Sequence, residues 1–132
     1  MKVEVDDFCF VCGQQNPHGL RLSGFCLEGE RYRFEWTPKP YLQGWQKIVH
    51  GGIIATVLDE AVTRLFWELS KPAVTAEITV RFVRPLFVGT KTLVEAWKVR
   101  ERGRLLEAEA TISDKLGEYA RSRALMLRVD GS

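Results

Sequence analysis

Apolar and polar residues alternate along most of the second half of the chain, and a period of two is typical of strands. Four strands are predicted there, over residues 74–83, 92–101, 105–113 and 118–129. Short turns that contain glycine separate each of them from the next. Two earlier strands are predicted over residues 20–27 and 30–36, joined at Glu28 and Gly29. Strands this close together in sequence favour an antiparallel meander.

One stretch, from residue 53 to about residue 69, has helical periodicity instead. At about 100° per residue, one arc of this helix is apolar and consists of Ile54, Leu58, Ala61, Val62, Leu65 and Leu69. The opposite arc carries Thr56, Glu60, Arg64 and Trp67, so Glu60 is expected in solvent, paired with Arg64. Small residues line one face of the last two strands and would let the helix lie close to them: Ala108, Ala110, Ala120 and Ala124. The predicted architecture is α+β, with one long central helix wrapped by a curved antiparallel sheet of about six strands.

The bulk composition fits one domain over residues 1–132, with an irregular segment over residues 1–19. A hydrophobic content of 45% and a charged content of 27% are ordinary for a soluble globular protein. The net charge of +2 gives no reason to expect a nucleic-acid partner. We expect no membrane partner either, since no apolar run is long enough to span a bilayer and the N-terminus lacks a signal-peptide pattern. Three cysteines, an odd number, favour a reducing compartment, and the expected location is cytoplasmic.

Candidate chemistry begins where the helix begins, at His50, Gly51 and Gly52. Two glycines at a helix start leave backbone N–H groups bare, and these donors suit an oxyanion or a polarised carbonyl. Asp59 lies at the edge of the apolar arc, where a carboxylate either has a partner or a function. The pattern leaves two alternatives open for Asp59: a catalytic role, or a capping or ion-pair role.

The N-terminal segment contains Cys9 and Cys12, which have the spacing of one half of a zinc knuckle. His18 could be a third ligand, and two copies of the chain could supply four thiolates. No second CxxC follows, so the favoured interpretation is a tight turn with small buried cysteines, with no metal and no cofactor. Tyr41 and Trp45 lie in the loop before His50, and we expect them to pack that loop down rather than to floor a pocket.

The chain resembles the hotdog-fold acyl-CoA thioesterases, above all the phenylacetate-pathway and THEM-like group. Two motifs carry the resemblance, HGGIIATVLD over residues 50–59 and VTAEITVRFVRP over residues 74–85. The likeness extends from about residue 20 to residue 129. It implies the hotdog fold and a homodimer or homotetramer, because hotdog domains usually pair through the strand after the helix and build sites across the interface.

The resemblance also implies a role for each matched residue. Asp59 matches the family's carboxylate, which acts as nucleophile or as general base on water. Gly51 matches the residue whose N–H polarises the thioester carbonyl, and His50 matches the motif histidine thought to orient groups near the thioester. Thr75 matches a Ser/Thr position that helps to hold the attacking water or the carboxylate, often from the facing subunit.

Substrate contacts are expected from Gly52 at the helix start, from Gln46 and from Arg84. Relatives commonly carry Asn or Gln about six residues before the histidine, and this chain has Gly44 there. Gln46 or Gln43, on either side, is the candidate substitute for that contact. Arg84 is a candidate partner for the phosphates of coenzyme A, among many basic residues of the C-terminal half.

The function expected from residues and resemblance together is hydrolysis of an acyl-CoA or aroyl-CoA thioester to the free acid and CoA. A thioester is already activated, so water, one carboxylate base and two or so N–H donors can suffice without a Ser-His-Asp triad. The alternative is a non-catalytic module that binds acyl-CoA or fatty-acyl groups. A hotdog dehydratase or hydratase ranks well below both.

Overall fold

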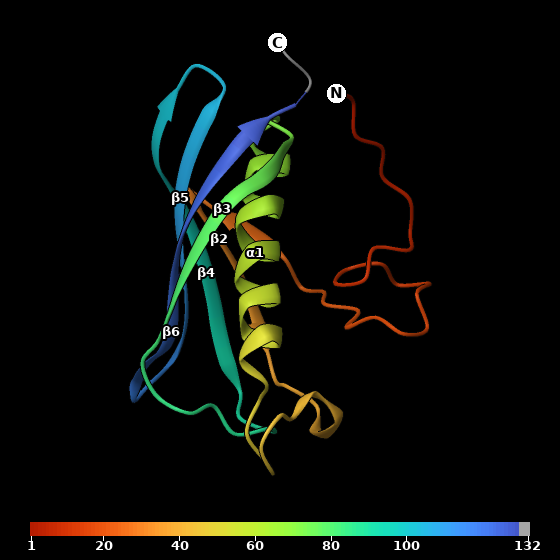
Figure 1. Cartoon of the computed structure of the whole chain (residues 1–132), viewed down its shortest axis with the longest axis vertical. Helices are drawn as coiled ribbons and strands as arrows, with labels where there is room; N and C mark the ends of the chain where they lie inside the picture. The colour runs from red at the N-terminus through yellow and green to blue at the C-terminus, as the bar shows by residue number, and fades with distance from the viewer. Residues whose placement is uncertain (130–132) are drawn as a thin grey trace.

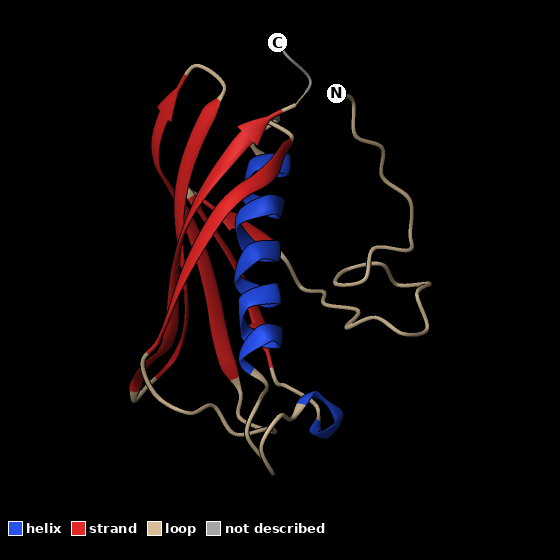
Figure 2. Ribbon diagram, in the orientation of Figure 1, coloured by secondary structure: helices blue, strands red, loops and turns tan. Residues whose placement is uncertain are grey.

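One long helix lies in the concave face of a curved antiparallel sheet, as Figure 1 and Figure 2 show. The computed structural model describes residues 1–129, and residues 130–132 of the predicted domain lie outside the described residues. The elements in chain order are β1 (Cys26–Glu28), β2 (Arg31–Trp36), the 3-10 helix η1 (Pro40–Leu42), α1 (Gly51–Glu68), β3 (Ala73–Phe82), β4 (Thr92–Arg102), β5 (Leu105–Asp114) and β6 (Gly117–Arg128). The predicted α+β architecture is confirmed.

All six strands form one sheet in the order β1-β2-β4-β5-β6-β3. Strand β3 follows α1 but pairs with β6, so the chain crosses the concave face and β3 becomes an edge strand. In β2, Tyr32, Phe34 and Trp36 are buried and the residues between them are more exposed, as alternation predicted. The sheet therefore offers α1 one continuous apolar face.

Helix α1 lies close to β5 and β6 because the side chains beneath it are small. The four predicted alanines of these strands are fully buried, as are the helix residues Val57, Leu58, Ala61 and Val62. The helix begins two residues earlier than predicted, because His50 serves as its N-cap. At its other end Ser70 has a positive φ of 61° and the Lys71 N–H donates to Phe66 O, which closes the last turn. Within residues 1–129, no helix combines the length and the apolar character that crossing a bilayer requires.

The strand predicted over residues 20–27 is wrong for most of its length, since only Cys26–Glu28 forms it. Arg21 and Gly24 have φ values of 53° and 80°, and a strand cannot continue through such residues. Residues 1–25 contain no helix or strand and run along the side of α1 that faces away from the sheet (Figure 1). This segment is held by backbone hydrogen bonds such as that from Leu22 N–H to Val11 O, 2.9 Å.

A β-bulge interrupts β3 near its start. Thr75 pairs with Met126 and Glu77 pairs with Leu125, so Ala76 between them has no partner in β6. Since side chains alternate across a strand, the extra residue places Thr75 on the same face as Ile78, the face toward α1. The sequence predicted uninterrupted alternation over residues 74–83, with Thr75 on the face opposite Ile78. That prediction is wrong for Thr75, because the bulge shifts the alternation by one residue.

Candidate active site

Two loops meet where α1 begins, at the lower end of the molecule in Figure 1. The Val49 N–H donates to Leu86 O at 2.8 Å, and the His50 N–H donates to Leu42 O at 2.9 Å. An isolated bridge pairs Ile48 with Phe87. These bonds fix the direction in which the chain enters the helix.

His50 caps the helix with both its backbone and its side chain. Its φ of −60° and ψ of 132° are extended, and its imidazole Nδ1 accepts a hydrogen bond of 2.9 Å from the Gly52 N–H. Its carbonyl oxygen accepts from the N–H groups of Ile53 and Ile54. The cap therefore uses the lone pair of this ring nitrogen as the hydrogen-bond acceptor.

The cap decides which amide is free. The sequence predicted bare N–H groups at both glycines, but His50 occupies the Gly52 N–H. Within residues 1–129, the Gly51 N–H has no acceptor. Gly51 therefore presents one donor at the positive end of the helix dipole, and an amide contact from Gly52 to substrate would have to break the cap.

A cavity of about 450 Å³ opens beside this free amide, lined by Gly44, Trp45, Val49, His50 and Gly51. Trp45 is 83% exposed and Tyr41 is 67% exposed, so the expectation that these aromatics pack the loop down is wrong. A Cβ atom on Gly44 would lie 3.1 Å from His50 Cδ2, so a larger residue there would press on the ring.

The glutamines beside Gly44 differ in what they do. The Gln43 side chain accepts a hydrogen bond of 2.8 Å from the Lys47 N–H, which gives it a role within the loop. Gln46 is exposed. A substrate contact of Gln46 stays a prediction.

Asp59 is half-buried between α1 and β3. The Thr75 hydroxyl donates to Asp59 Oδ1 at 2.5 Å, from the face of β3 to which the bulge turns Thr75. The structure thus brings Asp59 and Thr75 together within one chain, whereas the resemblance implied that Thr75 often comes from the facing subunit. This contact orients one carboxylate oxygen and leaves Oδ2 for another partner.

Gly51 and Asp59 are not close to each other within one chain. Eight residues at a rise of 1.5 Å separate them by about 12 Å along the helix axis. A donor and a base that act on one carbonyl must each lie within about 3 Å of the reacting atoms.

Arg84 lies in the loop after β3, and two of its three guanidinium nitrogens already donate hydrogen bonds. Its Nε donates to Glu118 O at 3.1 Å, and its Nη2 donates to Asp114 Oδ1 and to Gly117 O, each at 3.0 Å. The guanidinium also lies over the Tyr119 ring, 3.8 Å from its centroid. These contacts brace the β5–β6 turn, and phosphate binding by Arg84 stays a prediction.

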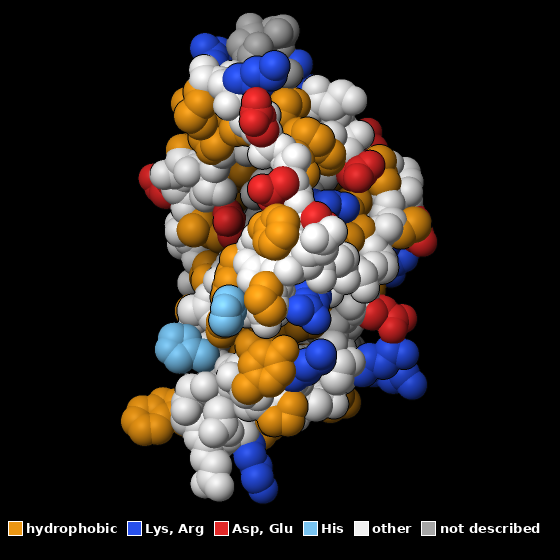
Figure 3. All heavy atoms as spheres, turned by 90° about the vertical axis from the view of Figure 1, so that its right-hand side faces the viewer, with side chains coloured by type: hydrophobic (Ala, Val, Ile, Leu, Met, Phe, Trp, Pro, Cys, Tyr) orange, Lys and Arg blue, Asp and Glu red, His pale blue; other side chains and the backbone are white. Residues whose placement is uncertain are grey.

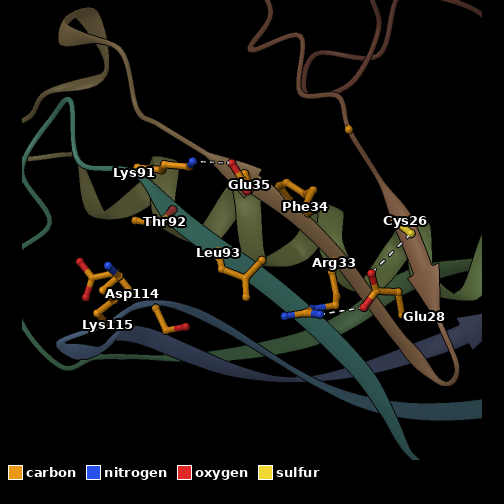
Figure 4. A pocket seen from close by; sticks show the side chains of 12 residues that line it. Cys26, Glu28, Arg33, Phe34, Glu35, Lys91, Thr92, Leu93, Asp114 and Lys115 are labelled. Carbon is orange, nitrogen blue, oxygen red and sulfur yellow. Dashed lines mark hydrogen bonds and ion pairs between the residues drawn. The ribbon is translucent and has the colours of Figure 1, made fainter.

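A larger hollow of about 720 Å³ lies on the outer face of the sheet, away from α1 (Figure 4). Two ion pairs join residues of its lining, Lys91 with Glu35 at 3.2 Å and Arg33 with Glu28 at 2.7 Å. Neither the free amide of Gly51 nor Asp59 reaches this hollow. Its lining comes from β1, β2, β4, the end of β5 and the β5–β6 turn, with Gly24 just before β1 and Lys91 just before β4. We therefore place the candidate site at the start of α1.

Glu60 is the site residue that sequence reasoning misplaced. It is only 7% exposed, because the N-terminal segment covers this face of α1, and within residues 1–129 it forms no ion pair with Arg64. Cys12 lies beside it; burial, together with the Glu60 carboxylate, raises the pKa of the Cys12 thiol to about 12. Burial also raises the pKa of Glu60. The CxxC turn was the signal in the sequence that could have pointed to Glu60, but no pattern along the chain showed that the turn packs against this residue.

One long helix wrapped by a curved six-stranded antiparallel sheet is the hotdog fold. The sequence pattern of the Thioesterase superfamily matches residues 46–125, from the loop before α1 into β6. The chain belongs to this superfamily.

The chain is similar in sequence to one named enzyme and in structure to several solved proteins. The mouse acyl-coenzyme A thioesterase THEM5 is 24% identical over 94 residues, which are 70% of this chain and 38% of that protein. The chain thus matches well under half the length of this relative. A Streptococcus mutans protein solved with acetyl CoA bound has a TM-score of 0.75 at 18% identity, covering 87% of this chain and 97% of that chain. The Escherichia coli PaaI protein of the phenylacetic acid degradation operon has a TM-score of 0.73 at 18% identity, covering 78% and 79%.

Proposed function

We propose that this protein hydrolyses an acyl-CoA or aroyl-CoA thioester to the free acid and CoA. The observation that carries the proposal is the free Gly51 N–H at the start of the helix that also holds the half-buried Asp59 carboxylate. The superfamily membership and the mouse relative's name support the reaction class. The acetyl CoA bound to the Streptococcus mutans protein supports a CoA ester as ligand.

In the proposed reaction Asp59 acts as general base. Its carboxylate takes a proton from a water, whose oxygen attacks the thioester carbonyl carbon. The carbonyl oxygen becomes an oxyanion that accepts a hydrogen bond from a Gly51 N–H. When the tetrahedral intermediate collapses, the carbon–sulfur bond breaks, and the CoA thiolate receives the proton that Asp59 holds.

The two halves of this site come from two copies of the chain. Gly51 and Asp59 are about 12 Å apart along one helix, too far for both to act on one carbonyl. Strand β3 is a ten-residue edge strand, and an unpaired edge is a template for another strand. Antiparallel pairing of two β3 edges about a two-fold axis sets the two α1 helices antiparallel. A two-fold axis that passes near α1 between Gly51 and Asp59 then brings the start of one helix beside the middle of the other.

The test of the function is release of free thiol from a panel of acyl-CoA and aroyl-CoA esters, recorded with a thiol reagent. We expect turnover with at least one ester. Tight binding of the esters without thiol release would instead show the non-catalytic binding module.

The shared site has a separate test by complementation. Asp59→Asn removes the base and Gly51→Pro removes the donor, so each homodimer is expected to be inactive. In a mixed dimer one site has both substitutions and the other has neither. Co-expression makes about half of the dimers mixed, so activity is expected to return to about one quarter of the wild-type value. The same co-expression with two differently tagged Asp59→Asn chains is the control. No recovery would show that each chain works alone.

A further inference from the structure

The N-terminal segment and α1 enclose a cluster of two thiols and one carboxylate that the thioesterase reaction does not use. Cys9, Cys12 and Glu60 each direct one potential ligand atom into it, and these atoms all lie within 4.8 Å of one another. The cluster borders a cavity of about 380 Å³ that Phe8 and Trp67 help to line. Figure 3 shows this side of the molecule, where exposed hydrophobic side chains lie among charged ones.

Glu60 is the unusual member of the cluster. It is 93% buried, and its Oε2 atom has no hydrogen-bond partner within residues 1–129. A buried carboxylate oxygen without a partner is costly, since water no longer solvates it. One carboxylate oxygen of Glu60 lies within 4.8 Å of both sulfurs, so a cation between the three ligand atoms would compensate the buried carboxylate.

The turn that carries the cysteines is rigid and directs both sulfurs to one side. The Gly13 N–H donates to Cys9 O at 2.9 Å, and the Val11 N–H donates to Cys9 Sγ at 3.4 Å. A Cβ atom on Gly13 would lie 2.4 Å from the Cys9 nitrogen, so this position requires glycine.

Arg64 completes the charge balance. Its Nη1 lies 4.0 Å from Cys12 Sγ, while its guanidinium lies over the Phe25 ring and its Nε contacts the Tyr32 hydroxyl at 3.4 Å. Two thiolates and one carboxylate carry three negative charges in total. A divalent cation and the Arg64 guanidinium together neutralise them.

We propose that Cys9, Cys12 and Glu60 bind one zinc ion. Thiolate ligands exclude the hard cations Ca²⁺ and Mg²⁺ and suit Zn²⁺, which accepts sulfur and carboxylate oxygen together. Three protein ligands leave one of four positions for water from the neighbouring cavity. Glu60 is thus the third protein ligand, the role that the sequence suggested for His18. The ion ties residues 1–25 to α1 at the residue directly after Asp59.

The experiment measures zinc binding by the full chain. The protein is reduced, stripped with a chelator and titrated with Zn²⁺ against a chromophoric competitor, and Co²⁺ is used in parallel because thiolate ligation gives a charge-transfer band in the near ultraviolet. We expect one ion per chain in wild type. Cys12→Ser is expected to abolish binding, and Glu60→Gln is expected to weaken it by more than about tenfold.

The third cysteine provides the matched control. Cys26→Ser on β1 is expected to bind zinc and Co²⁺ as wild type does, because Cys26 is exposed and lies outside the cluster. Glu60→Gln keeps the size of the side chain, so the circular dichroism of the stripped protein shows whether this variant is folded. Wild type that takes up no zinc after reduction would overturn the proposal. So would unchanged affinity in a folded Glu60→Gln variant, which would leave a site of cysteines alone.

Discussion

Asp59→Asn is expected to lower kcat for thioester hydrolysis by about 10²- to 10⁴-fold, the usual contribution of a general base. The amide cannot take a proton from water. It still offers an oxygen to the Thr75 hydroxyl, so the contact of 2.5 Å between α1 and β3 has a replacement. The loss should therefore appear in kcat, measured by thiol release at saturating ester, and not as unfolding.

A carboxylate elsewhere on the surface is the control for this substitution. Glu35→Gln on β2 removes one negative charge from the outer face of the sheet, where Glu35 pairs with Lys91. Exposed pairs of this kind contribute little to stability, and this variant is expected to keep the wild-type rate. Turnover by Asp59→Asn at the same rate as Glu35→Gln would remove Asp59 from the mechanism.

Gly51→Pro is expected to lower kcat by about 10²- to 10³-fold, the cost of losing one oxyanion donor. Proline deletes the Gly51 N–H, which has no acceptor within residues 1–129. Gly51 is the first residue of α1, where proline is well tolerated, and His50 already has the extended conformation that a residue before proline requires. The substitution therefore removes a hydrogen-bond donor while the helix remains, which a thermal melt can verify.

Gly51→Ala separates the missing donor from the added bulk. Alanine keeps the N–H, and its Cβ would lie 3.4 Å from the Phe82 ring, an ordinary van der Waals contact. We expect Gly51→Ala to retain most of the wild-type kcat. Equal losses in the alanine and proline variants would point to crowding by the side chain, and the Gly51 amide would then have no part in the reaction.

Periodicity in the sequence was sufficient to predict most of the architecture. The alternating pattern predicted the buried faces of β2 and of the last strands, and the helical repeat predicted the apolar arc of α1. Both patterns reflect which side chains are buried in the fold. Asp59 was visible as a candidate because it interrupts an apolar arc. The double glycine marked the helix start. Strand ends were less accurate, as Arg21 and Gly24 show, since a positive φ leaves little trace in hydrophobicity.

The tertiary structure alone decided which groups meet. One extra residue in β3, Ala76, turns Thr75 toward Asp59, and no local pattern signals a bulge that depends on pairing with β6. The His50 ring occupies one predicted donor and leaves the other free. Glu60 follows a solvent-facing repeat, yet it is buried, because a segment some fifty residues earlier covers it. Sequence periodicity records local exposure, whereas these contacts depend on where distant parts of the chain come together in space.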